Sequence, residues 1–328
     1  MSGRPPADDG AAGALEGLRR VPVGDRPNKV ESGDFAAPAL PGGSFREFLA
    51  SLPRVLAADS FRAVASGIAS AVRSSRTCLW MLGGHVVKTG LSRVLIDLME
   101  RGAITHVAVN GATVIHDYET CRWGGTSEDV EAGLIDGTFG MALETGRDMN
   151  LAIRAGRDRG LGLGQALAED LAARDDNRHE ALSLLLACRR LGVGLTVHAA
   201  LGAEIIHQHP EADGAAIGET SYRDFLVLTR AVEGLDDGGV ALNIGSAVLL
   251  PEVFLKALTV ARNRTGGRPR RFLTADLDMI RHYRPRVNVV ERPTRTGGGV
   301  GFQITGHHEI MVPLLAWAVA EELPSEGA

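Results

Sequence analysis

The sequence predicts an α/β protein with a doubly wound, mostly parallel, Rossmann-like sheet that carries helices on both faces. Short apolar runs alternate with helical patterns along most of the 328 residues, which is typical of such a sheet. The clearest unit is the stretch 77–117, where two apolar runs flank a segment with apolar residues at helical spacing. A strand, a crossover helix and a second strand of this size form a right-handed unit with parallel strands.

The first 43 residues have no periodic pattern and are rich in Gly, Ala, Pro, Asp and Arg. We predict a disordered tail over 1–43, and an arm that orders on a neighbouring subunit is the alternative. One α/β domain is predicted over 44–325, because no repeat or composition break divides it. It begins with helical patterns at 44–56 and 60–72, which we expect to cover the sheet.

The remaining elements follow from apolar periodicity and from glycine and proline positions. In the central unit, strands at 77–82 and 104–109 flank a helix at 91–99 that Gly102 closes. A loop is predicted at 118–125. Later strands are predicted at 193–199, 239–244, 272–275, 287–290 and 302–305. Later helices are predicted at 141–159, 161–173, 180–191, 222–235, 251–263 and 311–322.

Composition argues against several classes of protein. The net charge of -5 and the pI of about 6.1 give no overall basic field that would hold nucleic acid. No apolar run approaches the roughly 20 residues of a membrane span, and the first residues lack the apolar core of a secretory signal. Three well-separated cysteines without CxxC spacing indicate reduced thiols. We therefore expect a cytoplasmic protein without disulfides or a zinc knuckle.

Three blocks of residues, in their order and spacing, resemble one known family. The first is Thr89-Gly90-Leu91-Ser92, its helix, and then Gly111-Ala112-Thr113-Val114 with Asp117 and Cys121. The second is Pro210, Asp213-Gly214 and Gly218-Glu219, and the third is Val312-Pro313-Leu314-Leu315. These blocks resemble the SGLR helix start with its AGG turn, the P-x-x-x-D-G-x-x-G-D loop with one residue inserted, and the F-P-L-L helix of deoxyhypusine synthase. The resemblance covers about residues 44–323.

The resemblance implies NAD as the cofactor, an amine-bearing small-molecule substrate, and a homotetramer or other homo-oligomer. One departure concerns the family's lysine, which forms an imine with an aminobutyl group taken from spermidine. Leu250 stands near its position and has no nucleophile, and Lys256 six residues later is more typical of a solvated surface. The family's Ser-Asn pair is replaced by Gly84-His85, and its acidic, tryptophan-containing segment by residues 276–286. We therefore expect this chain to share the fold of the family more fully than its reaction, deoxyhypusine synthesis.

Ligands of parallel sheets bind beyond the carboxyl ends of the strands, which predicts where the cofactor lies. The Gly-x-Gly-x-x-Gly fingerprint is absent, so tight-turn glycines without a ligand are the alternative. We also match Asp213 to the family's cofactor-binding acids, with a plain Asp-Gly turn as the alternative. The predicted cofactor contacts are Gly83, Gly84, His85, Asn110, Gly111, Ala112, Asp213, Gly245 and Ser246.

Histidines and carboxylates gather at the predicted strand ends. Histidines suit proton transfer, and the predicted catalytic residues are His116, His207, His209 and His308. Carboxylates can hold a cationic amine, and the predicted substrate contacts are Asp117, Glu219, Asp276, Asp278 and His282. In an extended chain, the spacing of His207 and His209 places both rings on one side. Neither histidine cluster has a recognised metal-ligand spacing, so no metal ligand is predicted.

Taken together, these features predict an NAD-dependent enzyme that dehydrogenates an amine-bearing small molecule or transfers part of it. A metal-assisted lyase or hydrolase on the same scaffold and a catalytically silent nucleotide-binding subunit are the alternatives. If Arg281, Arg284 and Arg286 face the site, the substrate also carries a carboxylate or phosphate.

Overall fold

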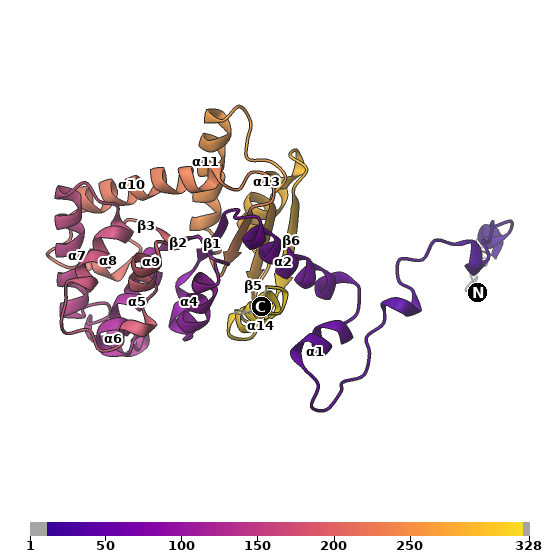
Figure 1. Cartoon of the computed structure of the whole chain (residues 1–328), viewed down its shortest axis with the longest axis horizontal. Coiled ribbons are helices and arrows are strands. Elements are labelled where there is room, and N and C mark those ends of the chain that lie inside the picture. Colours follow the sequence, from indigo (N-terminus) through magenta and orange to yellow (C-terminus); the bar gives the residue numbers. More distant parts are fainter. Residues whose placement is uncertain (1–11, 324–328) are drawn as a thin grey trace, which may run out of the picture.

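The computed structural model describes residues 12–323, and its centre is a six-stranded sheet. Figure 1 shows helices packed around this sheet. All neighbouring strands are parallel, in the order β3-β2-β1-β4-β5-β6. The predicted doubly wound α/β fold is confirmed, and the strand order reverses between β1 and β4. The strands are β1 (Cys78–Leu82), β2 (His106–Asn110), β3 (Gly194–His198), β4 (Val240–Ile244), β5 (Leu273–Asp278) and β6 (Val300–Thr305).

Helices cover both faces of the sheet because alternate residues of the strands are apolar and buried on each side. Trp80 and Leu82 of β1 belong to one apolar cluster, and Leu79 and Met81 belong to the other. The first cluster includes side chains of α2 (Leu56–Arg73), α4 (Ser92–Glu100), α9 (Leu184–Leu191) and α14 (His308–Glu322). The second includes side chains of α10 (Gly214–Glu233), α11 (Leu249–Arg264) and the π-helical segment η6 (Arg286–Glu291).

The other helices are shorter or lie beside the sheet. They are α1 (Phe45–Ser51), α3 (Gly84–Lys88), α5 (Gly111–Trp123), α6 (Val130–Asp136), α7 (Leu143–Asp158), α8 (Leu163–Ala172), η4 (Glu180–Leu182), η5 (Ile205–Gln208), α12 (Tyr283–Pro285) and α13 (Arg292–Arg295). Within residues 12–323, no helix combines the length and the apolar character that crossing a membrane requires.

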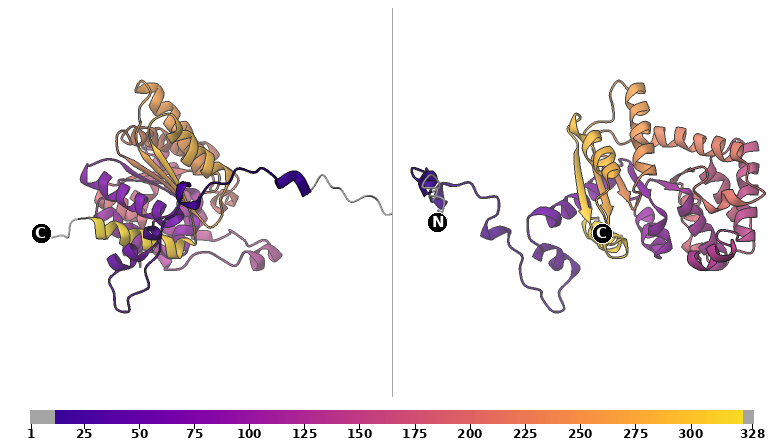
Figure 2. Two further views of the ribbon diagram at one scale, coloured as in Figure 1. Left: turned by 90° about the vertical axis from the view of Figure 1, so that its right-hand side faces the viewer. Right: turned by 180° about the vertical axis from the view of Figure 1, so that it is seen from behind.

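Residues 12–43 run away from the sheet in both views of Figure 2. They contain three short 3-10 turns, η1 (Ala12–Leu15), η2 (Val23–Asp25) and η3 (Ser32–Asp34). This segment meets the chain ahead of α2, because Ala37 N donates to Ser51 O and Arg54 N donates to Asp34 O. The rest of the predicted tail, residues 1–11, and the end of the predicted domain at 324–325 lie outside the described residues. The tail and the single domain stay predictions.

The predicted loop at 118–125 is wrong, because α5 begins directly after β2 and continues to Trp123. The Asn110 side chain accepts a hydrogen bond from Thr113 N and so caps the helix at its start. The buried side of α5 includes the polar residues Thr113, Asp117 and Arg122, so its sequence shows no apolar stripe. The pair Asn110-Gly111, which is typical of a turn, therefore marks the start of a helix here.

The predicted strand at 287–290 is also wrong, since this run lies in η6. Its β-branched residues favour a strand locally. In the structure, however, Val289 packs with the apolar side chains of α10 and α11. Tertiary packing therefore decides the conformation of this short apolar run, as often happens when periodicity is ambiguous.

The turns after β1 and β4 meet where the strand order reverses. Gly83 N donates to Ile244 O, and a Cβ built on Gly83 would overlap the carbonyl oxygen of Gly245. Gly245 itself has φ of 70°, which favours glycine. Glycine at position 83 is thus required by the close approach of two backbones.

Replacing Gly83 by alanine is expected to destabilise the fold by about 1–3 kcal/mol, because neither backbone can move away easily. The matched control is Gly218→Ala in α10, where a Cβ meets nothing within 4 Å. The control should stabilise the protein by up to about 1 kcal/mol, since alanine favours a helix. Urea unfolding of both variants measures the difference, and equal stabilities would show that the turns separate without strain.

Arg122 joins α5 to its neighbours through a buried ion network. Its Nη1 lies 2.6 Å from Asp148 Oδ2 of α7, and its Nη2 lies 2.6 Å from Asp176 Oδ2 beyond α8. The guanidinium also lies 4.4 Å from the centre of the Trp123 ring. Only 4% of Arg122 is exposed, so its charge depends on these partners.

Two buried histidines lie side by side on β2 and β3. The Nε2 atoms of His106 and His198 each lie 3.2 Å from Thr196 Oγ1. Burial lowers the pKa of His106 to about 4 and that of His198 to about 3, where the nearby His106 also contributes. Both rings are therefore neutral in the folded protein at neutral pH.

The outer edge of β3 is closed by a side chain of α10. Asp224 accepts hydrogen bonds from Val197 N of β3 at 2.7 Å and from Gly164 N of α8 at 2.9 Å. Only 2% of Asp224 is exposed, and burial raises its pKa to about 7. One carboxyl group thus ties the edge strand, α8 and α10 together.

Candidate functional site

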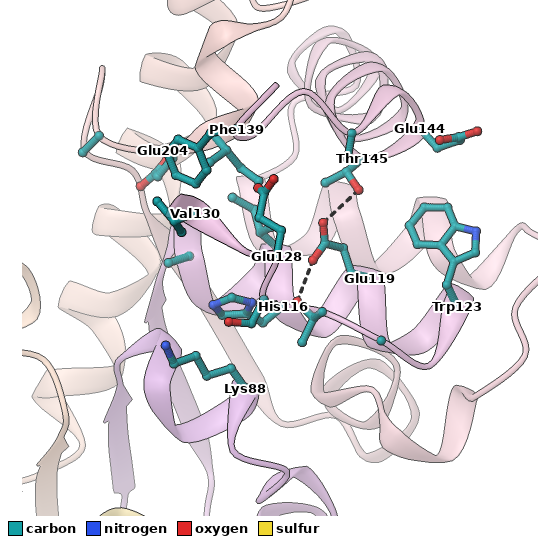
Figure 3. Close-up of a pocket in the computed structure, with 18 residues that line it drawn as sticks. Lys88, His116, Glu119, Trp123, Glu128, Val130, Phe139, Glu144, Thr145 and Glu204 are labelled. Atoms are coloured by element: carbon teal, nitrogen blue, oxygen red, sulfur yellow. Dashed lines mark hydrogen bonds between the residues drawn. The ribbon is translucent and has the colours of Figure 1, made fainter. Parts of the chain in front are cut away.

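A pocket of about 720 Å³ opens beside the carboxyl ends of β2 and β3 (Figure 3). Its walls come from α3, α5, the segment that contains α6, the start of α7 and the chain after β3. This volume lies in the range of small-molecule and cofactor sites. Its charged and aromatic lining residues are Lys88, His116, Glu119, Trp123, Glu128, Phe139, Glu144 and Glu204.

The charges of the pocket favour a cationic ligand. Of the described residues, four glutamates line it, whereas Lys88 is its only lysine or arginine. Burial raises the pKa of Glu119, and the nearby Glu128 raises it further. Glu128 and Glu144 are exposed to solvent, so their carboxylates are accessible to a ligand. A ligand with one or more ammonium groups would reduce the repulsion among these carboxylates.

Lys88 and His116 lie together at one end of the pocket, with the Lys88 side chain pointing toward the imidazole (Figure 3). Burial lowers the pKa of His116, and the positive charge of Lys88 lowers it further. His116 is therefore neutral at neutral pH. Lys88 remains available for an anionic group of a ligand.

The start of α5 is closed by Glu204. Its carboxylate accepts hydrogen bonds from the backbone of Ala200, at 2.9 Å, and of Gly111. A Cβ on Gly111 would overlap this carboxylate. The amides that would receive a phosphate at a helix N-terminus thus already face a carboxylate. The end of β2 is a poor fit for the pyrophosphate of NAD.

The turns after β1 and β4 fit a cofactor better. The ring of His308 lies over Gly245, and its centre is 5.4 Å from that of His85. Two buried polar atoms here, His308 Nδ1 and Asn243 Oδ1, have no hydrogen-bond partner within residues 12–323. Because buried polar atoms are usually satisfied, these two are candidates for partners that a ligand supplies. The predicted residues of these two turns therefore remain candidate cofactor contacts: Gly83, Gly84, His85, Gly245 and Ser246.

A buried polar row lies next to these turns. Asn243 Nδ2 donates to Asp276 Oδ1 at 2.9 Å and to Ser246 O at 3.0 Å. Burial raises the pKa of Asp276 to about 6. Asp278 Oδ1 lies 3.8 Å from His308 Nε2. The predicted residues Asp276, Asp278 and His308 are thus close together, and the nearby His282 lowers the pKa of Asp276, against the larger effect of burial.

Other predicted residues make contacts outside the pocket. Asp117 accepts hydrogen bonds from Ser183 Oγ and from the backbone of Leu184 and Leu185, so it caps α9. Asp213 caps α10 and pairs with Arg157 at 2.8 Å. Glu219 pairs with Arg223. Among the predicted catalytic and cofactor residues, His116 and Ala112 line the pocket.

His207 and His209 do not share one side, because residues 205–208 form η5 and not an extended chain. His207 Nδ1 accepts from Gly202 N, and its Nε2 lies 3.2 Å from Glu204 Oε2. His209 Nε2 lies 2.9 Å from Gly140 O. The arginines of the 276–286 segment also have other partners, since Arg284 contacts Glu252 and Arg286 contacts Glu291. Arg284 and Arg286 are thus paired with carboxylates, whereas Arg281 Nε donates to Thr305 Oγ1 at 3.1 Å, at the end of β6. An anionic substrate group at Arg281 stays a prediction.

No set of three histidine, cysteine, aspartate or glutamate side chains is placed to hold a metal ion within residues 12–323. The residues that sequence analysis missed are Glu119, Thr126, Glu128, Glu144 and Thr145, which surround His116 or face it across the pocket. His116 and Glu119 lie three residues apart, so the helical assignment of α5 would have placed them on one face.

The comparison with known proteins rests on solved structures. No protein-family model matches the chain, and no curated protein matches it. A ternary complex of AgrE with ornithine and NAD+ is 15% identical with a TM-score of 0.51, and unliganded AgrE is 16% identical with a TM-score of 0.50. Both matches cover 82% of this chain and 34% of AgrE, so the chain spans about a third of that protein. At these identities the likeness shows the fold alone.

Solved structures similar to this chain also include a candidate deoxyhypusine synthase from Entamoeba histolytica. It is 10% identical with a TM-score of 0.49, and the match covers 88% of this chain and 97% of that one.

Proposed function

We propose that this chain is a divergent member of the deoxyhypusine synthase superfamily, an NAD-dependent enzyme that acts on an amine-bearing small molecule. The observation that carries this proposal is the acidic pocket beside the carboxyl edge of a parallel sheet. The sequence blocks described above support the family, and AgrE, which shares the fold, was solved with ornithine and NAD+.

The substrate would bind through its ammonium groups. Glu128 and Glu144 face the pocket from two different segments, so they suit a ligand with two separated positive charges. Lys88 would contact a carboxylate if the ligand is an amino acid. The half-buried Glu119 and the buried Glu204 also line the pocket.

NAD would lie at the turns after β1 and β4, where the side chains of Ser246, His85 and His308 would contact it, because the amides of Gly83 and Gly245 already donate to Ile244 O and Leu277 O. When bound, it supplies a hydride acceptor for the carbon that carries the amine. Deoxyhypusine synthesis itself is not proposed, because Leu250 is buried in α11 and offers no nucleophile. Lys256, six residues later, pairs with Glu252 on the exposed side of α11.

We further propose a homo-oligomer. The outer wall of the pocket includes α6, where Leu134 and Ile135 are exposed and no residue is buried. A second copy that covers α6 would remove these apolar side chains from water.

The experiment is calorimetric titration of the full chain with spermidine and with ornithine, each with and without NAD. The double variant Glu128→Gln/Glu144→Gln should weaken amine binding by roughly 10- to 100-fold, because two charge-assisted contacts are lost. Glu309→Gln, an exposed carboxylate of α14 outside the pocket, is the matched control and should bind as the unmodified chain does.

The two parts of the proposal fail in different ways. Equal affinities for the double variant and the control would contradict amine binding in this pocket. Amine binding without any formation of NADH, followed by its absorbance, would contradict the NAD-dependent reaction and leave the binding site in place. A fully acetylated, uncharged analogue of spermidine serves as the ligand control.

A further inference from the structure

His116 is the end of a hydrogen-bonded chain that runs through three segments of the structure. Its Nδ1 lies 2.7 Å from Thr126 Oγ1, in the loop after α5. Thr126 Oγ1 donates to Glu119 Oε2 at 2.6 Å, and Thr145 Oγ1 of α7 donates to Glu119 Oε1 at 3.0 Å. Figure 3 shows hydrogen bonds at both oxygens of Glu119.

The direction of these hydrogen bonds fixes the tautomer of His116. A hydroxyl group has one proton, and Thr126 donates its proton to the carboxylate of Glu119. The oxygen of Thr126 must therefore accept the hydrogen bond from His116, which requires a proton on Nδ1. In the neutral ring, Nε2 then carries a lone pair.

The free nitrogen of His116 belongs to the pocket. His116 lines the cavity, and within residues 12–323 no hydrogen-bond partner is found for its Nε2. The charged groups around the ring are Lys88 of α3, Glu119 of α5 and Glu128 of the following loop. Lys88 disfavours a charged imidazole at rest, whereas Glu119 would stabilise the imidazolium through Thr126 once it forms.

We propose that His116 is the proton acceptor of this pocket, held with Nε2 toward the ligand by Thr126 and Glu119. In its resting state, Nε2 accepts a hydrogen bond from the amino group of the ligand. In turnover, an N–H bond of that group breaks, its electron pair stays on the ligand nitrogen, and a new Nε2–H bond forms. The proton then leaves to water. Thr126 and Glu119 are positioning residues, because they act through His116. Only the identity of the ligand rests on the proposed function.

The first test is the tautomer itself, which needs neither NAD nor an amine. Long-range 1H–15N spectra of the labelled full chain distinguish Nδ1–H from Nε2–H rings, and His116→Gln identifies the signal. We expect Nδ1–H for His116. Thr126→Val should move the ring toward Nε2–H, and Thr126→Ser should restore Nδ1–H. Thr259→Val, on the exposed side of α11, is the matched control and should leave the signal unchanged.

The second test is kinetic, with the amine found by titration. Thr126→Val and His116→Gln should lower kcat by about 10²- to 10⁴-fold with a small change in KM, as expected for loss of a positioned base. Thr126→Ser should recover most of this loss. An Nε2–H ring in the unmodified chain, or a Thr126→Val variant with unchanged tautomer and kcat, would overturn the proposal. The spectra do not depend on turnover. If only the substrate class is wrong, the kinetic test fails and the tautomer is still Nδ1–H. If the hydrogen-bonded chain is wrong, the tautomer itself differs.

Discussion

Replacing Arg122 by methionine is expected to destabilise the protein by about 3–5 kcal/mol, because the buried partner Asp148 loses the most buried of its cations. Methionine keeps much of the volume of the aliphatic stem, so the loss arises mainly from charge. Arg147 and Arg174 also contact Asp148, but neither reaches Asp176. Urea or thermal unfolding at low salt measures the change in free energy.

The matched control for this variant is Arg190→Met, since Arg190 pairs with Glu100 on the surface at 2.8 Å. An exposed pair of this kind contributes about 0–1 kcal/mol. If both variants lost the same small amount, the network around Arg122 would be no stronger than a surface ion pair. A large loss in Arg122→Met alone would support its role in fixing α5, which also carries His116 and Glu119.

Acid is expected to unfold the protein partly through His106 and His198. The pKa of each ring is lower in the folded protein than the usual value of about 6.5, so the unfolded chain binds more protons as the pH falls. Their contribution to stability is therefore present above about pH 6.5 and is lost as the pH falls toward 4. For His106, with its pKa of about 4, the loss amounts to roughly 3 kcal/mol.

Buried carboxyl groups act in the opposite direction, and the experiment must separate the two effects. The pKa values of Asp117, Asp224 and Asp276 are raised to about 6, 7 and 6, so these groups favour the folded state as the pH falls. The difference between the unmodified chain and His106→Gln cancels them. The variant should lose less free energy of unfolding than the unmodified chain between about pH 7 and about pH 4.5.

The control for the acid experiment is His307→Gln, because His307 is mostly exposed. It should follow the unmodified chain at every pH. Parallel curves for His106→Gln and the unmodified chain would show that the buried rings do not contribute to acid unfolding.

The fold was predictable because its strands are short, largely apolar runs, and a glycine directly follows β1, β2, β4 and β6. The runs of β1, β2, β3 and β4 stand where the sequence predicts them, within a residue or two. The run at 287–290 failed because four apolar residues do not distinguish a strand from a helical segment. Only its packing against α10 and α11, which lie elsewhere in the chain, determines the outcome.

The candidate site was predictable only in part. Strand ends pointed to Gly83, Gly245 and His116, because these follow directly from the order of the elements. The hydrogen-bonded chain from His116 to Glu119 also includes Thr126, from a loop, and Thr145, from another helix. No spacing in the sequence connects them to His116. Likewise, the spacing of His207 and His209 predicted two rings on one side of an extended chain. This prediction is wrong, because residues 205–208 form η5.

The contact of Asp224 with the amide of Val197 has a consequence for aggregation. An edge strand with free amides is a template on which another chain can add a strand. At β3 one of these amides is already bonded to a side chain of the same molecule, and α10 covers the edge. Removing the carboxyl group would leave the amide of Val197 without this partner. The same aspartate thus protects this edge against the growth of intermolecular sheets.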